Sequence, residues 1–235
     1  MTFRGWVKCS LAEYPGKVST VLFTGGCNFR CPYCYNPELV LDAPGLPRID
    51  PHEVLEALRS RSGLVTAAVL TGGEPTLQSG LPEFLERARS LGVSLSLATN
   101  GSSPEALEAL LDRALLDRVA MDVKSELEPG AYAAAAGCDD PGLLGRIRSS
   151  LRAIRGSGVD YELRCTVVPA LHSAERLIRI AEALSGCRHL VFQELRSARC
   201  LDPSLRGAPP FPRDELELVR ERAAGFVERC TIRSD

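Results

Sequence analysis

Short runs of β-branched and other apolar residues alternate with amphipathic segments along nearly the whole chain. The runs predict six strands, at residues 18–24, 66–71, 93–99, 118–123, 161–168 and 189–195. Between two of them, apolar side chains share one helical stripe in the segment Leu81–Leu91. Repeated strand–helix units predict a parallel sheet with right-handed crossovers. We therefore expect an α/β fold, an open partial barrel of six such units, with a doubly wound open sheet as the competing topology.

The size and composition of the chain fit one ordinary hydrophobic core. The sequence has 235 residues, 45% of them hydrophobic. We expect a single domain over residues 1–235, with a short N-terminal extension at 1–17 and a C-terminal helix at about 212–230. Neither an internal repeat nor a low-complexity linker interrupts the sequence.

Charge and hydropathy argue against several classes of partner. The 28 Lys and Arg residues nearly balance the 30 Asp and Glu residues, so a broad basic face for nucleic acid is not expected. The sequence starts without the apolar run of a signal peptide, and no segment approaches the roughly 20 apolar residues of a membrane span. We expect a cytoplasmic protein that does not bind membranes, with its nine cysteines reduced.

Three cysteines follow the first predicted strand in the stretch "GGCNFRCPYC", at Cys27, Cys31 and Cys34. A C-x3-C-x2-C pattern would arise by chance on the order of 0.01 times in a chain with this cysteine content. Three thiolates can converge on a metal, but zinc sites and ordinary four-iron clusters usually take four protein ligands. The pattern therefore indicates either an open coordination position or a zinc site completed by a remote residue such as Cys9 or Cys200.

Other unusual residues also stand where predicted strands end. "GGEP" follows the second strand, Asn100 ends the third, and Asp122 with Lys124 ends the fourth. Carboxyl ends of parallel strands form the face where active sites are built. The glycines of "GGEP" would let the backbone approach a ligand, Glu74 could accept from an ammonium, and Lys124 could meet a carboxylate.

The motif "CNFRCPYC" followed by "TGGEP" resembles the signature of the radical S-adenosylmethionine (SAM) enzymes. The resemblance implies that Cys27, Cys31 and Cys34 hold one [4Fe-4S] cluster, and that SAM chelates the fourth iron. It further implies SAM contacts from a set of residues at the strand ends: Tyr33, Gly72, Gly73, Glu74, Asn100, Asp122, Lys124 and Arg164. The ordinary alternatives are a tight turn for "GGEP" and for Asn100, a surface ion pair for Asp122 and Lys124, and a structural role for Arg164.

A narrower resemblance extends from about residue 5 to about residue 203. Together with "MDVKSELEPGAY" and "RCTVVPALHS", the motifs are similar to those of glycyl-radical-enzyme activating enzymes, most of all the anaerobic ribonucleoside-triphosphate reductase activating protein. The pattern departs at Tyr35, where relatives often carry His. The resemblance implies reductive cleavage of SAM to a 5'-deoxyadenosyl radical, which takes hydrogen from a glycine of a partner enzyme. A one-electron donor such as flavodoxin or ferredoxin would supply the electron.

Two other functions stay open at this point. One is a radical SAM reaction on a small molecule, similar to that of 7-carboxy-7-deazaguanine synthase. The other is a zinc-stabilised binding module without catalysis.

The remaining cysteines and the histidines show no further ligand spacing. No cysteine occurs between Cys34 and Cys138, so one cluster is predicted. Buried or idle thiols are the expectation for the other six cysteines: Cys9, Cys138, Cys165, Cys187, Cys200 and Cys230. Surface or core roles are expected for His52, His172 and His189, and Glu194 and Arg199 are weak candidates for the site.

Overall fold

The computed structural model describes residues 1–234. The chain forms two compact units. The first comprises Met1–Asn28, Glu38–Ala120 and Ser149–Asp160, and the second comprises Phe29–Pro37, Met121–Arg148 and the chain from Tyr161 onward. The expectation of one domain over residues 1–235 stays a prediction.

The first unit is built on strands β1 (Phe3–Ser10), β2 (Ser19–Thr24), β3 (Ala67–Gly72) and β4 (Ser94–Thr99). Strand β1 pairs antiparallel with β2, whereas β2, β3 and β4 are parallel. Thr24 lies opposite Gly72 in the register of β2 and β3. The loops that carry the first cysteine and "GGEP" therefore leave the sheet at the same edge.

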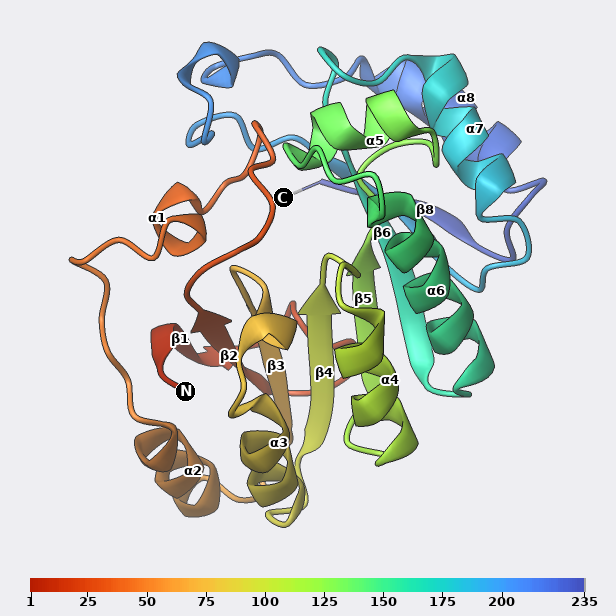
Figure 1. Cartoon of the computed structure of the whole chain (residues 1–235). Coiled ribbons are helices and arrows are strands. Elements are labelled where there is room, and N and C mark those ends of the chain that lie inside the picture. Colours follow the sequence, from red (N-terminus) through yellow and green to blue (C-terminus); the bar gives the residue numbers. More distant parts are fainter. Residues whose placement is uncertain (235) are drawn as a thin grey trace. The chain divides into compact units, whose positions relative to one another are not determined.

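Helices α2 (Pro51–Ser60), α3 (Leu81–Arg89) and α4 (Pro104–Asp112) belong to the first unit. A short helix α1 (Pro37–Val40) and a 3-10 turn, η1 (Pro75–Leu77), lie in its loops. The backbone N–H of His52 donates to the carboxylate of Asp50, which caps α2. Helix α3 packs beside β4 (Figure 1), and its residues Leu81, Phe84, Leu85 and Ala88 are buried.

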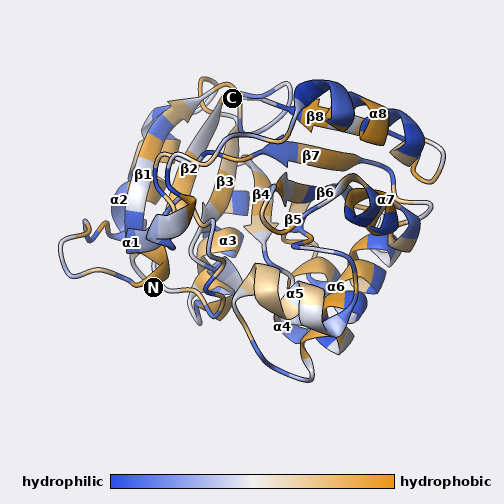
Figure 2. Cartoon of the chain, turned by 90° about the horizontal axis from the view of Figure 1, so that it is seen from above, coloured by the Kyte–Doolittle hydropathy of each residue, from blue (hydrophilic) through white to orange (hydrophobic). Residues whose placement is uncertain are grey.

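The second unit contains the parallel strands β6 (Asp160–Val167), β7 (Leu190–Glu194) and β8 (Cys230–Arg233). Its helices are α5 (Pro129–Ala136), α7 (Ala174–Ala183) and α8 (Arg213–Ala223), with a 3-10 turn η2 (Pro203–Leu205). Helices α7 and α8 pack side by side (Figure 1). Figure 2 shows α5 in pale hydrophobic colours, because it consists mainly of alanines. Helix α8 is mostly hydrophilic, with apolar residues on one side.

Strand β5 (Arg118–Asp122) and helix α6 (Leu143–Gly156) are divided between the two units. Strand β5 ends in the second unit, and helix α6 begins there. The strands follow one another in the sheet in chain order from β1 to β8, and the sheet is open. This order confirms the expected α/β fold with an open, mostly parallel sheet, and it excludes the doubly wound alternative, in which the strand order reverses.

All six predicted strands are confirmed with ends within two residues of the expected ones. The segment expected as an extension, 1–17, contains β1, which pairs along β2. The C-terminal helix expected to reach about residue 230 is shorter, because α8 ends at Ala223 and residue 230 begins β8.

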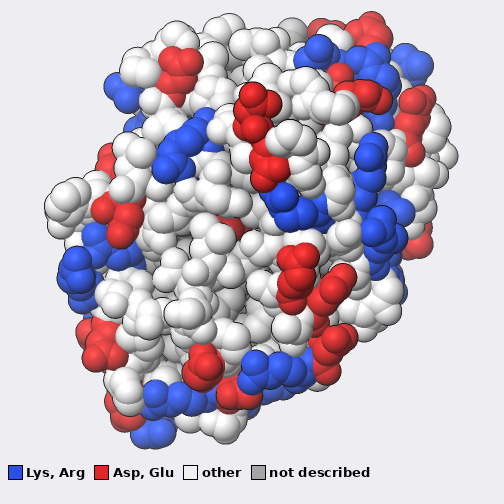
Figure 3. Space-filling view, in the orientation of Figure 1, with Lys and Arg blue, Asp and Glu red and all other residues white. Residues whose placement is uncertain are grey.

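Surface charge and helix length agree with the composition. On the face in Figure 3, Lys and Arg are interspersed with Asp and Glu, so this face carries no extended basic field. None of the helices among residues 1–234 combines the length and the apolar character that a membrane span needs.

Candidate functional site

The three predicted ligand cysteines lie on the loop that leaves β2, and the loop passes from the first unit to the second. Cys27 belongs to the first unit and is half-buried, while Cys31 and Cys34 belong to the second, Cys31 buried and Cys34 half-buried. Within residues 1–234, no three His, Cys, Asp or Glu side chains form a group that could hold a metal ion. Shared ligation of a cluster by the three thiols therefore stays a prediction.

Backbone hydrogen bonds fix the second part of this loop. The N–H of Cys34 donates to the carbonyl of Cys31 at 3.0 Å, which closes a turn around Tyr33. The N–H of Arg30 donates to Ala136 at 2.9 Å. Gly137 ends α5 in a left-handed conformation, and a Cβ on it would lie 2.1 Å from the carbonyl oxygen of Arg30. The loop therefore rests directly on the end of α5.

In the first unit, Glu74 holds the end of β4. Its Oε1 accepts from the N–H of Thr76 at 3.1 Å and from the hydroxyl of Thr99 at 2.7 Å, and its Oε2 accepts from the N–H of Asn100 at 2.7 Å. The carboxylate is 1% exposed, and burial raises its pKa despite these hydrogen bonds. Donors of the protein itself enclose the side chain, and the expected contact with an ammonium of SAM stays a prediction.

The two glycines before Glu74 allow β3 to approach the cysteine loop. Gly72 has a φ of +117°, which favours glycine, and a Cβ on Gly73 would lie 1.9 Å from the carbonyl oxygen of Gly26. The N–H of Glu74 donates to that same oxygen at 2.8 Å. The structure thus shows a close approach between two backbones, where the sequence predicted an approach to a ligand.

Asn100 links the end of β4 to the first cysteine. Its side-chain amide nitrogen donates to the sulfur of Cys27 at 3.8 Å and to the side-chain oxygen of Asn28 at 3.0 Å. Its own side-chain oxygen accepts from the N–H of Ser102 at 2.9 Å. The first unit therefore brings Cys27, Glu74 and Asn100 together, and Asn100 does more than form the turn that its Asn-Gly sequence indicates.

In the second unit, Lys124 and Asp122 form an ion pair beyond β5. The ammonium of Lys124 donates to the carboxylate of Asp122 at 2.8 Å, and the lysine side chain is only 12% exposed. Burial disfavours the charged ammonium, but the charge of Asp122, together with Cys31 and Tyr33, outweighs burial and raises the pKa of Lys124. A buried cation of this kind is well suited to meet an anionic ligand group.

Tyr33 supplies a polar atom that lacks a partner. Its side chain is 5% exposed, and its hydroxyl makes no hydrogen bond with the residues that the structure describes. Burial raises the pKa of Tyr33, and the charges of Cys31, Lys124 and Asp122 also act on it. A buried tyrosine hydroxyl normally finds a partner, so a polar group is expected to reach this position.

Arg164 is paired within the protein, as expected for the structural role that was the alternative to SAM binding. Its guanidinium pairs with Glu162, which is buried and also binds Arg233. Glu194, a weak candidate, pairs with Arg213 at 3.1 Å. Both side chains are engaged within the protein, and a SAM contact of Arg164 stays a prediction.

His172, for which a surface or core role was expected, is buried and contacts the backbone of Lys124. Its ring is 2% exposed and binds the carbonyl oxygen of Lys124 at 3.0 Å. The two residues are 48 positions apart, so no local spacing signals the contact.

Four of the six other cysteines are buried, Cys138 is half-buried and Cys9 is exposed. Their idle role stays a prediction. Cys165, Cys187, Cys200 and Cys230 are buried, and burial raises the pKa of Cys165 to about 12. A thiol of that pKa is not a ready metal ligand or nucleophile at neutral pH.

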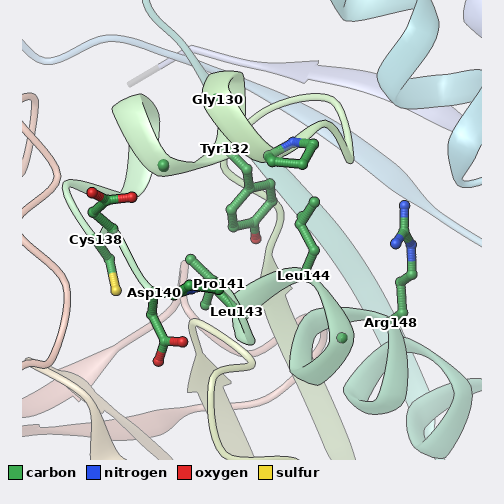
Figure 4. A pocket seen from close by; sticks show the side chains of 12 residues that line it. Gly130, Tyr132, Cys138, Asp140, Pro141, Leu143, Leu144 and Arg148 are labelled. Carbon is green, nitrogen blue, oxygen red and sulfur yellow. The ribbon is translucent and has the colours of Figure 1, made fainter.

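A separate pocket lies within the second unit (Figure 4). It has a volume of about 350 Å³ and lies between α5, the loop after it and the start of α6. Tyr132, Cys138 and Arg148 are among the side chains that line it. None of the predicted site residues does so.

The residue types of the two units, each taken by itself, fit a cluster and SAM. Cys27, Cys31 and Cys34 carry thiol groups, the ligand type that iron–sulfur clusters require. The unpartnered hydroxyl of Tyr33 and the ammonium of Lys124 can meet polar and anionic groups of a cofactor.

Comparison with known proteins points the same way. The model of the radical SAM superfamily matches residues 21–172, more than half of the chain. A Methanocaldococcus jannaschii protein that carries the name of a glycyl-radical enzyme activating enzyme is 29% identical over 234 residues, which cover 98% of this chain and 95% of that protein. The pyruvate formate-lyase-activating enzyme of Clostridium pasteurianum is 29% identical over 79% of this chain and 76% of its own. A GTP 3',8-cyclase homologue of Thermococcus kodakarensis is 31% identical over 66% of this chain and 49% of its own.

Solved structures share the fold. Streptococcus suis SuiB bound to S-adenosylmethionine superposes with a TM-score of 0.69 at 12% identity, over 91% of this chain and 52% of SuiB. The chain thus spans about half the length of that protein. TYW1 with a lysine-pyruvate adduct gives a TM-score of 0.62 at 13% identity, over 88% of this chain and 73% of TYW1.

Proposed function

Because this chain belongs to the radical SAM superfamily, whose enzymes use a [4Fe-4S] cluster and SAM, we propose that it installs a glycyl radical on a partner enzyme. The observation that carries this proposal is similarity to a glycyl-radical activating enzyme homologue along almost the full length of both chains. The activating enzyme from Clostridium pasteurianum supports the same class of protein substrate.

In this proposal Cys27, Cys31 and Cys34 would hold the cluster, and a one-electron donor such as flavodoxin or ferredoxin would supply the electron. When bound, the cluster and SAM supply the chemistry, reductive cleavage of SAM to methionine and a 5'-deoxyadenosyl radical. The spacing of the three cysteines supports this assignment.

The side chains of the second unit orient SAM. The ammonium of Lys124, held by Asp122 at 2.8 Å, meets the carboxylate of SAM, and the hydroxyl of Tyr33 donates to a polar group of the cofactor. Since both side chains are largely buried, their contacts act in a region from which water is mostly excluded, and each contact is stronger there than in solvent.

The first unit orients the cofactor through its backbone and through Asn100. Gly72, Gly73 and Glu74 hold the end of β3 against the cysteine loop, and backbone groups of that turn would bind the amino group of SAM. Support comes from the hydrogen bond between the N–H of Glu74 and the carbonyl of Gly26, which ties this turn to the residue before Cys27.

The partner proposed is an anaerobic ribonucleoside-triphosphate reductase, on the resemblance of "MDVKSELEPGAY" and "RCTVVPALHS". A radical reaction on a small molecule is the second candidate, favoured by the 31% identity to a GTP 3',8-cyclase homologue, although the chain spans only 49% of that protein. Membership of the superfamily argues against the zinc-stabilised module.

The test starts from protein reconstituted anaerobically with iron and sulfide, then reduced with dithionite in the presence of SAM. Chromatography measures 5'-deoxyadenosine, and electron paramagnetic resonance follows mixtures with purified candidate glycyl-radical enzymes. The proposal predicts 5'-deoxyadenosine together with a glycyl-radical doublet on one candidate. Deoxyadenosine without a radical on any candidate would shift the assignment to the small-molecule reaction.

A further inference from the structure

His172 makes two hydrogen bonds that determine its protonation. The backbone N–H of Val168 donates to Nδ1 at 3.0 Å, and Nε2 lies 3.0 Å from the carbonyl oxygen of Lys124. An amide N–H can only donate and a carbonyl oxygen can only accept. The ring must therefore carry its proton on Nε2 and none on Nδ1, which is the neutral form of histidine.

The ring joins two loops that follow neighbouring strands in the chain. His172 and Val168 belong to the turn after β6, where the N–H of His172 also donates to the carbonyl of Val168 at 2.8 Å. Lys124 lies two residues beyond β5, where the N–H of Val123 donates to the carbonyl of Arg164 at 2.7 Å. The turn fixes the backbone of His172, and the ring in turn fixes the backbone of Lys124.

Lys124 is thereby held at both ends. Its carbonyl is bound by the imidazole of His172, and its ammonium is bound by Asp122 at 2.8 Å. With the lysine side chain 12% exposed and the imidazole 2% exposed, little space remains for an alternative position of either group.

We propose that His172 is a positioning residue for the cofactor site: its neutral imidazole fixes the Lys124 carbonyl and so places the ammonium that meets the carboxylate of SAM. This inference rests on the SAM contact of Lys124 given under the proposed function. The competing role is that of a core histidine, which stabilises the fold without affecting the position of Lys124.

Two substitutions separate these roles, because each keeps one of the two hydrogen bonds. In His172→Asn the side-chain oxygen can replace Nδ1 as acceptor for Val168, but nothing reaches Lys124. In His172→Gln the amide N–H can replace Nε2 as donor to Lys124, but the N–H of Val168 loses its acceptor. A core role predicts similar effects of both, whereas positioning predicts that only the asparagine variant disturbs Lys124.

The first readout needs neither cluster nor SAM. The sequence has three lysines, Lys8, Lys17 and Lys124, so nuclear magnetic resonance of the full chain with isotope-labelled lysine gives three assignable sets of side-chain signals. His172→Asn is expected to shift the Lys124 signals and leave those of Lys8 and Lys17 in place, and His172→Gln is expected to leave all three near wild type. Unshifted Lys124 signals in a folded His172→Asn variant would overturn the proposal.

The second readout is the dissociation constant of SAM, measured by equilibrium dialysis with the cluster-loaded protein. His172→Asn is expected to raise it roughly tenfold, the size of one lost hydrogen bond, and His172→Gln to change it little. The double variant His172→Asn, Lys124→Ala is expected to bind SAM as weakly as Lys124→Ala alone, because both changes act through Lys124.

The outcomes separate the two claims. If Lys124→Ala leaves SAM binding unchanged, the proposed contact of Lys124 with SAM fails, and the role of His172 at the cofactor site falls with it. If Lys124→Ala weakens binding and His172→Asn does not, only the role of His172 fails. Should the asparagine variant not fold, the glutamine variant decides: folded protein with shifted Lys124 signals and weakened SAM binding contradicts the proposal.

Discussion

The side-chain amide of Asn100 donates a hydrogen bond to the sulfur of Cys27 across 3.8 Å. The same residue is fixed by two further contacts, from its own N–H to Glu74 at 2.7 Å and from the N–H of Ser102 to its side-chain oxygen at 2.9 Å. The amide is thus held in one orientation by residues on both sides of it. If Cys27 is a cluster ligand, the hydrogen bond from Asn100 to its sulfur influences the reduction potential of the cluster.

Replacing Asn100 with Ala is expected to lower the reduction potential of the cluster. A donor to a ligand sulfur stabilises the more negative, reduced cluster, so its loss makes reduction harder. A redox titration followed by electron paramagnetic resonance measures the potential. Gln78→Ala is the control, because it removes a donor to the carbonyl of Gly25 without touching a cysteine. Equal potentials for Asn100→Ala and wild type would contradict a role of this hydrogen bond.

Replacing Cys27, Cys31 or Cys34 singly with Ala is expected to abolish cluster binding and SAM cleavage, since each removes one of three ligands. Iron and sulfide analysis after anaerobic reconstitution checks the first effect, and 5'-deoxyadenosine formation checks the second. The matched control is Cys187→Ala, a buried thiol outside the motif, which is expected to spare both. A variant of the motif that keeps its full iron content would remove that cysteine from the ligand set.

Glu74→Gln is expected to destabilise the fold by about 1–3 kcal/mol. Both oxygens of the Glu74 carboxylate accept hydrogen bonds, from Thr76, Thr99 and Asn100. In the glutamine variant the amide NH2, which is a donor, replaces one of these oxygens and faces a donor. The backbone N–H of Asn100 cannot become an acceptor. Urea unfolding of the cluster-free chain measures the change. Glu56→Gln is the control, because Glu56 is exposed and its pair with Arg59 contributes little, with an expected change within about 0.5 kcal/mol. Equal stability of the two variants would show that the Glu74 network is not stabilising.

Much of the fold was predictable because its strands are rich in β-branched and other apolar residues and alternate with helical segments. Strands β2 to β7 follow this pattern, although β6, "DYELRCTV", also contains charged residues. Strand β1, "FRGWVKCS", mixes charged with apolar residues, and strand β8, "CTIR", is only four residues long, so periodicity did not reveal them. The spacing of the three cysteines and the position of polar residues at strand ends also predicted which residues belong to the candidate site.

The internal contacts of the site were not predictable in the same way. The spacing of "GGEP" suggests glycines that face a ligand, but the approach of Gly73 to Gly26 depends on how β2 and β3 pair. The enclosure of Glu74 requires donors from two separate loops. The contact of His172 with Lys124 joins residues 48 positions apart, and only the folded chain brings them together.

The stability of the protein is expected to contain a pH-dependent part from His172. Burial lowers the pKa of His172, and the nearby Arg176 adds to this effect, whereas the Lys124 carbonyl and Glu126 oppose it. The unfolded imidazole takes up a proton near pH 6.5, at about its usual pKa, and the folded one only at lower pH. The unfolded chain therefore binds more protons in this range, so the contribution of His172 is present above about pH 6.5 and is lost as the pH falls through its lowered pKa.

Denaturant unfolding of wild type and His172→Gln from about pH 7.5 down to about pH 5 tests this dependence. The stability advantage of wild type over the variant is expected to shrink as the pH falls. An advantage that stays constant or grows toward low pH would contradict a neutral, buried His172.

The proposed abstraction of hydrogen from a partner's glycine is tested most directly by isotope transfer. The partner enzyme is prepared with glycine deuterated at its alpha carbon and mixed anaerobically with the reduced, cluster-loaded protein and SAM. Mass spectrometry then measures deuterium in the 5'-deoxyadenosine. The proposal predicts one deuterium in each 5'-deoxyadenosine formed together with a glycyl radical. Deoxyadenosine that forms in the presence of the partner but carries no deuterium would contradict glycyl-radical installation by this protein.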